Sequence, residues 1–454
     1  MKSYSENWRQ TEVADRVEEA AEGGVGAAVG RTFRSLTIRN YRLFFGAQVV
    51  SWTGTWIQWV GQAWLVLRLT HSGLALGLTT AFQWLPVLLF GAWGGVLADR
   101  FPKRRVLLAT NAAAGVLALI LGLATAGGAV SLWLIMIVAF ALGIVTAVDN
   151  PTRQAFTLEM VGADQVPNAV SLNTFVFTIA RVLGPAVAGI LIATIGIGPC
   201  FLINAASFVP VLVALWAMRG SELNTTDPVA RAKGQIREGL RYVASVPILR
   251  TLLLMMAVIG TLTYNFHVIL PLLARFTFHG GARTYGILSA FLGVGMLIGS
   301  LVSASRAHPT LRFLLVSGFS LGFFILVASL VPSFPLELVS MVPLGASSMA
   351  FVSTLNATLQ LNASDDMRGR VMALYFVVFL GSTPIGAPIV GWIAQQFNPR
   401  VALGLGGVAT IGSCAYAWSR LRSLWTHDEA GSGSAGAEDR IASASAERVL
   451  QERA

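Results

Sequence analysis

The feature that most limits what this chain can fold into is a succession of long apolar segments with almost no charged residues. Blocks of about 20 mainly apolar residues recur between residues 42 and 418, with short polar gaps between them. An α-helix needs roughly that length to cross the hydrocarbon core of a bilayer. Charged residues make up 12% of the chain, against the ~25% usual in a soluble domain. The chain is therefore predicted to be an all-α integral membrane protein.

The apolar segments predict twelve transmembrane helices in two sets of six. The first set is expected at residues 42–69, 73–98, 106–126, 132–150, 169–195 and 198–218, and the second at 248–274, 285–304, 313–330, 335–358, 371–396 and 401–419. This division predicts one bundle at 31–218, a cytoplasmic linker with a surface helix at 219–247, and a second bundle at 248–421. The tails, 1–30 and 422–454, are rich in Ala, Gly, Ser and Glu, and are expected to be disordered.

The distribution of Lys and Arg predicts the orientation. With a cytoplasmic N-terminus, Arg181 lies inside a span and only four of the 32 Lys and Arg residues fall on the outer side, namely Arg68, Arg275, Arg283 and Arg400. Cytoplasmic loops carry an excess of these residues, so both termini are expected in the cytoplasm. The same asymmetry accounts for the net charge of +10. No basic face is left for nucleic acid, which is not expected as a partner.

The two sets of helices resemble each other. One constant shift along the chain aligns four pairs of residues: Gly143 with Gly345, Asp164 with Asp366, Gly184 with Gly386, and Gly189 with Gly391. Transporters with duplicated halves bind their cargo at the interface of the repeats. The alternative is that small residues recur by chance in membrane helices.

Four sequence motifs resemble a known family. The loop GVLADRFPKRR at 95–105 resembles the signature loop of the major facilitator superfamily, with Pro102 where that family has Gly. The segments DNPTRQAF at 149–156, ARVLGPAVAG at 180–189 and MRGRVMALY at 367–375 are similar to the enterobactin-exporter-like and drug-exporter branch. The resemblance covers about residues 31–421. It implies two pseudo-repeated six-helix bundles around a central cavity, in a bacterial inner membrane.

The resemblance also implies a function. It indicates a monomeric secondary transporter that exports a small amphiphilic molecule, drug-like or siderophore-like, by alternating access and proton antiport. Two alternatives stay open: an importer of the same fold, in which Arg181 binds a carboxylate of the solute, and a membrane sensor or enzyme that does not transport. The sequence contains no P-loop, no dinucleotide-binding motif and no cluster of metal ligands. Neither catalysis nor a cofactor or metal is therefore expected.

The loop after the second span is implied by the resemblance to be a cytoplasmic gate. In that reading Asp99 and Lys103 latch the two halves together in one state, with Arg100, Arg104 and Asp149 beside them. The alternative is a basic loop that only sets the orientation.

The fifth span contains Gly184-Pro185, followed by Gly189, which is similar to the antiporter motif of drug/proton exchangers. A Gly-Pro pair weakens a helix and admits a close neighbour. These three residues are expected to form a hinge, and the alternative is an ordinary kinked helix.

Polar and aromatic residues inside the spans predict a substrate cavity. Five residues of the first span recur at intervals of three and four and share one helical face: Gln48, Trp52, Thr55, Trp59 and Gln62. The seventh span has a similar patch of Thr261, Tyr264 and Asn265. His267 lies off that patch, and it is expected to be a packing residue rather than a proton carrier.

Arg181 is the one basic residue well inside a span, and it shares a helical face with Asn173 and Phe177. A charge within the membrane must meet a partner or face a cavity. Asp149 is the expected partner, either as a static ion pair or as part of the gate. The functional alternative is that Arg181 meets an anionic group of the cargo, or that Asp149 carries a proton.

Overall fold

The computed structural model describes residues 33–224, 235–306 and 309–422, and its regular structure in those ranges is entirely helical. The first group of helices is η1 (Arg34–Thr37), α3 (Arg39–Thr70), α4 (Gly73–Arg100), α5 (Lys103–Ala126), α6 (Leu132–Val161), η2 (Ala163–Gln165), α7 (Val166–Thr194) and α8 (Ile197–Ala217), followed by the turn η3 (Gly220–Glu222). The second group is α9 (Gln235–Ser245), α10 (Pro247–Leu262), α11 (Phe266–Leu272), η4 (Leu273–Thr277), α12 (Ala282–Ala304), α13 (Leu311–Leu330), α14 (Phe334–Leu361), α15 (Arg368–Gln396) and a last helix, Pro399–Arg422.

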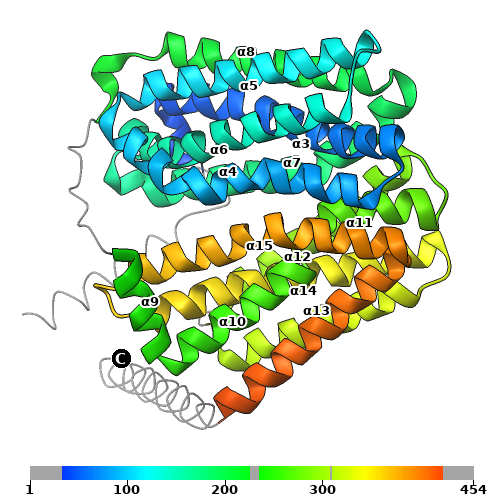
Figure 1. Ribbon diagram of the computed structural model, residues 1–454. Helices are drawn as coiled ribbons and strands as arrows, with labels where there is room; N and C mark the ends of the chain where they lie inside the picture. The colour runs from blue at the N-terminus through cyan, green and yellow to red at the C-terminus, as the bar shows by residue number, and fades with distance from the viewer. Residues whose placement is uncertain (1–32, 225–234, 307–308, 423–454) are drawn as a thin grey trace, which may run out of the picture.

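Figure 1 shows these groups as two layers of helices, α3–α8 in one and α9 to the last helix in the other. The all-α prediction is confirmed. The short helix α9 falls within the segment expected to carry a surface helix. The expected disorder of the tails concerns residues outside the described ranges.

Eleven helical segments of the described chain are long and apolar enough to cross a membrane. The remaining long helix, α3, has 32 residues, which is about 48 Å at 1.5 Å per residue. It is less apolar than the others because it carries amide side chains, among them the buried Gln48, Gln58 and Gln62. With α3, the described chain has the twelve long helices that the sequence predicts.

The span expected at 248–274 is interrupted. Three residues without helical structure separate α10 from α11, which then runs into the single π-helical turn η4. Thr263 Oγ1 donates a hydrogen bond of 3.0 Å to the carbonyl of Gly406, and Asn265 Nδ2 donates one of 2.7 Å to the carbonyl of Thr261. The amide of Asn265 thereby satisfies the carbonyl that its own backbone N–H would bond in a continuous helix, as a break inside a membrane requires, while Thr263 links the break to the last helix.

Glycines set the distance between the two groups of helices, which meet where α4 packs on α15 and α7 packs on α12. A Cβ atom added to Gly391 would lie 2.2 Å from the carbonyl oxygen of Gly73, and one added to Gly286 would lie 2.5 Å from that of Pro185. Both contacts lie toward the end of the molecule where α4 and α12 begin and α7 and α15 finish. At that end, backbone touches backbone and the groups are closed on each other.

The internal repeat is visible in equivalent contacts. Gly143 of α6 faces the carbonyl of Gln83 in α4, and Gly345 of α14 faces that of Leu292 in α12. This aligned pair therefore performs the same task in both groups, which is to let two helices approach closely. Gly189 and Gly391 occupy the two matching contacts between the groups.

Replacing Gly391 with Ala is expected to destabilise the protein, because the new methyl group would collide with backbone that cannot rotate aside. Overpacking of this kind costs about 1–3 kcal/mol. Gly412→Ala is the matched control, since no atom lies within 4 Å of the added Cβ and Ala favours a helix over Gly by about 1 kcal/mol. Thermal unfolding in detergent should show a lower midpoint for the first variant only, and equal midpoints would contradict the close contact.

Candidate functional site

A small cavity lies where the two groups of helices meet, and helices of both groups line it. The lining comes from α3, α7, α11 and α12, and its aromatic and polar members are Trp56, Trp59, Arg181, Phe266, His267, Tyr285 and Ser289. The cavity volume is about 30 Å³, which is close to the space of one water molecule. In this conformation the cavity is nearly closed.

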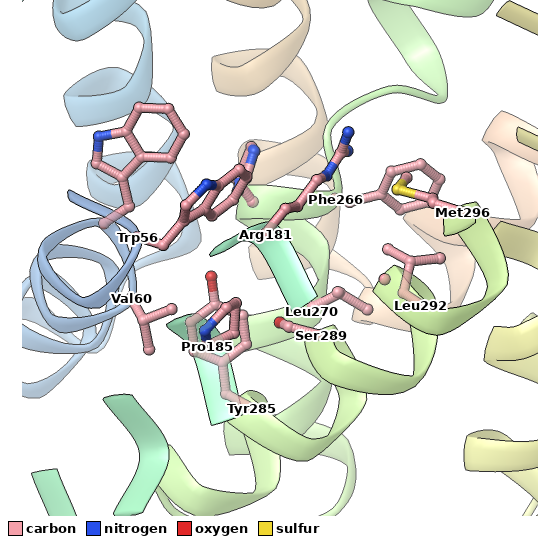
Figure 2. Close-up of a pocket in the computed structure, with 13 residues that line it drawn as sticks. Trp56, Val60, Arg181, Pro185, Phe266, Leu270, Tyr285, Ser289, Leu292 and Met296 are labelled. Atoms are coloured by element: carbon pink, nitrogen blue, oxygen red, sulfur yellow. The ribbon is translucent and has the colours of Figure 1, made fainter. Parts of the chain in front are cut away.

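Arg181 of α7 is the charged residue of this lining. Figure 2 shows its side chain between Trp56 on one side and Phe266 and Met296 on the other. The guanidinium carbon lies 5.7 Å from the centre of a ring of Trp56, a distance at which a cation is attracted to the ring face. Among the described residues, Arg181 forms no ion pair with a carboxylate.

The expected pairing of Arg181 with Asp149 is wrong. Asp149 pairs with Arg153, one turn further along α6, and also accepts hydrogen bonds from Thr110 (2.7 Å) and Asn111 (3.1 Å) of α5. A partner four residues away on the same helix needs no additional chain ordering. The carboxylate of Asp149 is therefore fully occupied within the first group, by Arg153, Thr110 and Asn111 rather than by Arg181.

Two of the five polar and aromatic residues expected on α3 contact the guanidinium of Arg153 and do not line a cavity. Gln48 accepts a hydrogen bond from the Arg153 guanidinium, whose carbon lies 5.0 Å from the ring centre of Trp52. Thr55 donates to the carbonyl of Ser51 on its own helix. None of the three lines the cavity beside Arg181.

The other two residues of that face do line cavities. Trp59 borders the cavity of Arg181 and a second one of about 30 Å³. Gln62 borders the second cavity, where its amide nitrogen donates to Gln83 of α4 at 3.1 Å. The face predicted from the spacing is therefore divided between an ion-pair network at one end and two cavities at the other.

His267, which was predicted to be a packing residue, lies beside the two cavities. It lines both cavities, and its ring centre lies 5.6 Å from that of Trp56 and 5.8 Å from that of Trp59. The residue is the second of α11, just after the break, so its direction is not that of a continuous helix. The helical spacing used for the prediction assumed continuity, and nothing in the apolar pattern marks the interruption.

The remaining predicted cavity residues form bonds within their own group of helices. Asn173 accepts a hydrogen bond from Tyr41, and Phe177 packs edge-on against Trp52 with ring centres 5.0 Å apart. Tyr264 donates to the carbonyl of Ser348 at 2.8 Å. None of these, nor Thr261 or Asn265, lines either cavity.

The residues of the predicted gate also have partners within the first group. Lys103 pairs with Glu159 of α6 at 2.7 Å, and Arg104 donates to the carbonyl of Leu215 in α8 at 2.6 Å. Asp99 is partly buried and Arg100 is exposed at the end of α4. A latch between the halves would therefore belong to another conformation, and the gate stays a prediction. Glu159 was not expected, because it lies beyond the predicted end of its span.

Two glycines of the predicted hinge, Gly184 and Gly189, lie where α7 packs against neighbouring helices. A Cβ on Gly184 would be 2.4 Å from Cβ of Trp56, so this glycine lets α7 press against α3 beside the cavity. Gly189 faces Ala282 and Gly286 of α12. α7 continues through Pro185 to Thr194, and a hinge movement at this place stays a prediction.

A buried carboxyl group that the sequence analysis did not single out is Glu337 in the first turn of α14. Its exposed fraction is 0%, and neither carboxyl oxygen has a hydrogen-bond partner among the described residues. Such a group is costly to bury in charged form. Among the described residues, its place in the fold, like that of Arg181, is not explained by an ion pair.

Comparison with known proteins places this arrangement among transporters. The family described as transmembrane secretion effectors matches residues 31–443. The staphyloferrin A transporter of Staphylococcus aureus is 26% identical over 82% of this chain and 93% of its own length. The multidrug efflux pump Tap of Mycolicibacterium fortuitum is 26% identical over 84% and 96%, and the enterobactin exporter EntS of Citrobacter koseri is 24% identical over 82% and 89%.

Solved structures share the fold at low sequence identity. An inward-facing bacterial homologue of the human lysosomal transporter Spinster has a TM-score of 0.65 at 16% identity, and covers 84% of this chain and 95% of its own. The nucleoside transporter NupG also has a TM-score of 0.65, at 12% identity, with 85% and 99% covered. Both are transporters of the major facilitator fold.

Asp149→Asn is expected to destabilise the protein by about 3 kcal/mol, because it leaves the partly buried Arg153 without its counter-ion. The control is Glu222→Gln, which breaks the Arg219–Glu222 pair, whose side chains are 63% and 39% exposed. An exposed pair contributes about 0–1 kcal/mol. Thermal unfolding in detergent should separate the two variants, and a midpoint for Asp149→Asn equal to that of the wild type would show that the network is dispensable.

Proposed function

Because this chain belongs to the transmembrane secretion effector family of the major facilitator superfamily, it is a multi-pass membrane transporter, and we propose that it exports a small amphiphilic molecule with an anionic group. The observation that carries the proposal is Arg181, a cation that has no carboxylate partner among the described residues and lies in a cavity lined by both groups of helices. The relatives support export of drug-like or siderophore-like cargo, since they include a siderophore transporter, a siderophore exporter and a drug efflux pump.

The lining suits the two parts of such a cargo. The guanidinium of Arg181 has several N–H donors in a planar fork that matches a carboxylate or phosphate. The rings of Trp56, Trp59 and His267, which contact one another, offer aromatic faces to an apolar part. The cargo would supply the counter-charge that the protein does not give to Arg181.

The small size of the cavity supports the proposal of alternating access. A volume of about 30 Å³ is far below the roughly 300–1,000 Å³ of ordinary ligand pockets. Cargo can therefore enter only after the two groups of helices move apart. We propose that the end closed by Gly391 and Gly286 faces the outside, because the excess of Lys and Arg at the other end favours cytoplasmic termini. The protein would act as a monomer in a bacterial inner membrane.

Proton antiport is the proposed energy source, with Glu337 as the proton carrier. In this conformation the carboxyl group is fully buried and accepts no hydrogen bond from the part of the chain that the structure describes, so a bound proton would spare the cost of burying a charge. The charged residue near enough to act on it is Arg400 of the last helix. We propose that opening of the outer end exposes the acid, and that Arg400 holds the carboxylate after the proton leaves.

Arg181→Gln is expected to reduce export of anionic compounds at least tenfold, because a charge-assisted hydrogen bond contributes about 1.5–3 kcal/mol. Arg181→Lys keeps the charge and should retain part of the activity. The assay measures accumulation of anionic and neutral dyes and of siderophores in a host that lacks its own pumps.

Arg219→Gln, at an exposed surface pair, is the control for expression and general charge loss. Wild-type export of anionic compounds by Arg181→Gln would contradict the proposed role of Arg181. If expression of the wild-type protein changed the accumulation of no compound, the export function itself would be refuted.

Glu337→Gln is expected to fold normally, since the amide resembles the protonated acid, but to abolish cargo-dependent proton movement. The measurement uses inside-out vesicles with an imposed proton gradient and a fluorescent pH probe. Adding cargo should dissipate the gradient for the wild type and for the exposed control Glu222→Gln, and not for Glu337→Gln. A cargo response of Glu337→Gln equal to that of the wild type would assign the proton to another group.

A further inference from the structure

Three of the four arginines on the proposed outer side gather in one pocket. Arg68 at the end of α3, Arg275 of η4 and Arg283 at the start of α12 line a pocket of about 400 Å³. They come from three segments that lie far apart in the sequence. A volume of this size is within the range of pockets that bind small molecules, in contrast to the nearly closed cavity beside Arg181.

The pocket contains positive charge without a protein counter-charge. Its lining includes no Asp or Glu, and among the described residues none of the three arginines forms an ion pair. The polar neighbour of Arg275 is His71, with Nη2 and Nε2 3.4 Å apart. Like charges in one pocket repel each other, and an anion placed between them removes that repulsion.

The charge is unusual for this side of the molecule. Basic residues on the outer side run against the bias by which loops are oriented during insertion, and this chain has only four of them. Chance placement would distribute them over the outer loops. The fold instead brings three together around an apolar wall that includes Trp64 and Ile197, which is the lining expected of a binding pocket.

The pocket continues the pathway of the first cavity. α3 lines the inner cavity at Val60 and the outer pocket at Arg68, eight positions and about 12 Å further along the helix. α7 and α12 also line both. Between the two spaces stands the contact of Gly189 with Gly286, which belongs to the closed end described above. An anion released from Arg181 toward this end would next meet the three arginines.

We propose that this pocket is an anion-binding site for a ligand that bears carboxylate or phosphate groups, at the outer end of the transport pathway. The binding itself stands on the pocket and its charges, and only its place on the pathway rests on the proposed export. Either a soluble anion or the headgroup of an anionic lipid has the required chemistry. The site holds its ligand by charge, so binding must weaken as the salt concentration rises.

The test measures binding to the purified full-length protein rather than transport, so a failure of the export proposal leaves it unaffected. Citrate is titrated in uncharged detergent at low salt, and the midpoint of thermal unfolding is recorded. The variant Arg68→Gln/Arg275→Gln/Arg283→Gln should bind citrate at least tenfold more weakly than the wild type. The control Arg105→Gln/Arg241→Gln/Arg250→Gln removes the same charge from exposed positions at the opposite end of the helices, and should bind like the wild type.

A second arm distinguishes the two sources of the anion. The titration is repeated in nanodiscs of phosphatidylcholine with and without phosphatidylglycerol. Citrate binding in both kinds of nanodisc, lost in the pocket variant, assigns the site to a soluble anion. Binding that phosphatidylglycerol abolishes in the wild type assigns the site to a lipid headgroup. Three results would overturn the proposal. The pocket variant could bind citrate as well as the wild type does, both triple variants could lose the same amount of binding, or neither arm could show any binding.

Discussion

The rest of the structure depends on the direct backbone contacts that glycines allow between α4 and α15 and between α7 and α12. In a membrane, apolar side chains gain little by leaving lipid for each other, so close packing of small residues favours helix association. These contacts close one end of the molecule and bring Arg181 and His267 to one small cavity. Two hydrogen bonds to Gln395 Oε1 of α15, from Ser72 Oγ and from the Leu74 backbone N–H, also join the groups at this end, and they must break before the two surfaces separate.

The ionisable residues fall into two classes that follow from this arrangement. Asp149, Arg153, Lys103 and Glu159 are paired within the first group of helices, where the Lys103–Glu159 pair joins α5 to α6 and the Asp149–Arg153 pair lies within α6. Arg181 and Glu337 have no ion-pair partner of this kind among the described residues. Arg181 lies in the cavity between the two groups, where the proposed cycle changes access to water, whereas Glu337 lies in α14 of the second group.

The architecture was predictable from the sequence, whereas the site was predictable only in part. The number of helices and the fold class follow from the length of the apolar segments and from how few charged residues they contain, and both can be read from each segment separately. The pairing of Asp149 was missed because it depends on which of two arginines is nearer in space, and Arg153 had been counted as a loop residue. The placement of His267 was missed because a break of three residues changes helical phase without changing hydropathy. Arg181 was predicted to be important because a single charged residue inside an apolar span is visible in the sequence without any knowledge of its neighbours in space.

Among the described residues Arg181 has no carboxylate partner, and this has a consequence for the energetics of the proposed export. A binding site that takes its counter-charge from the cargo sends one negative charge outward with each molecule and resets without it. A bacterial cell is electrically negative inside, and moving one elementary charge through 100 mV is worth about 2.3 kcal/mol. An anion moving out and a proton moving in shift charge in the same direction, so the voltage would drive both. The exchange would be electrogenic, and it would continue on voltage alone when the pH difference across the membrane is zero.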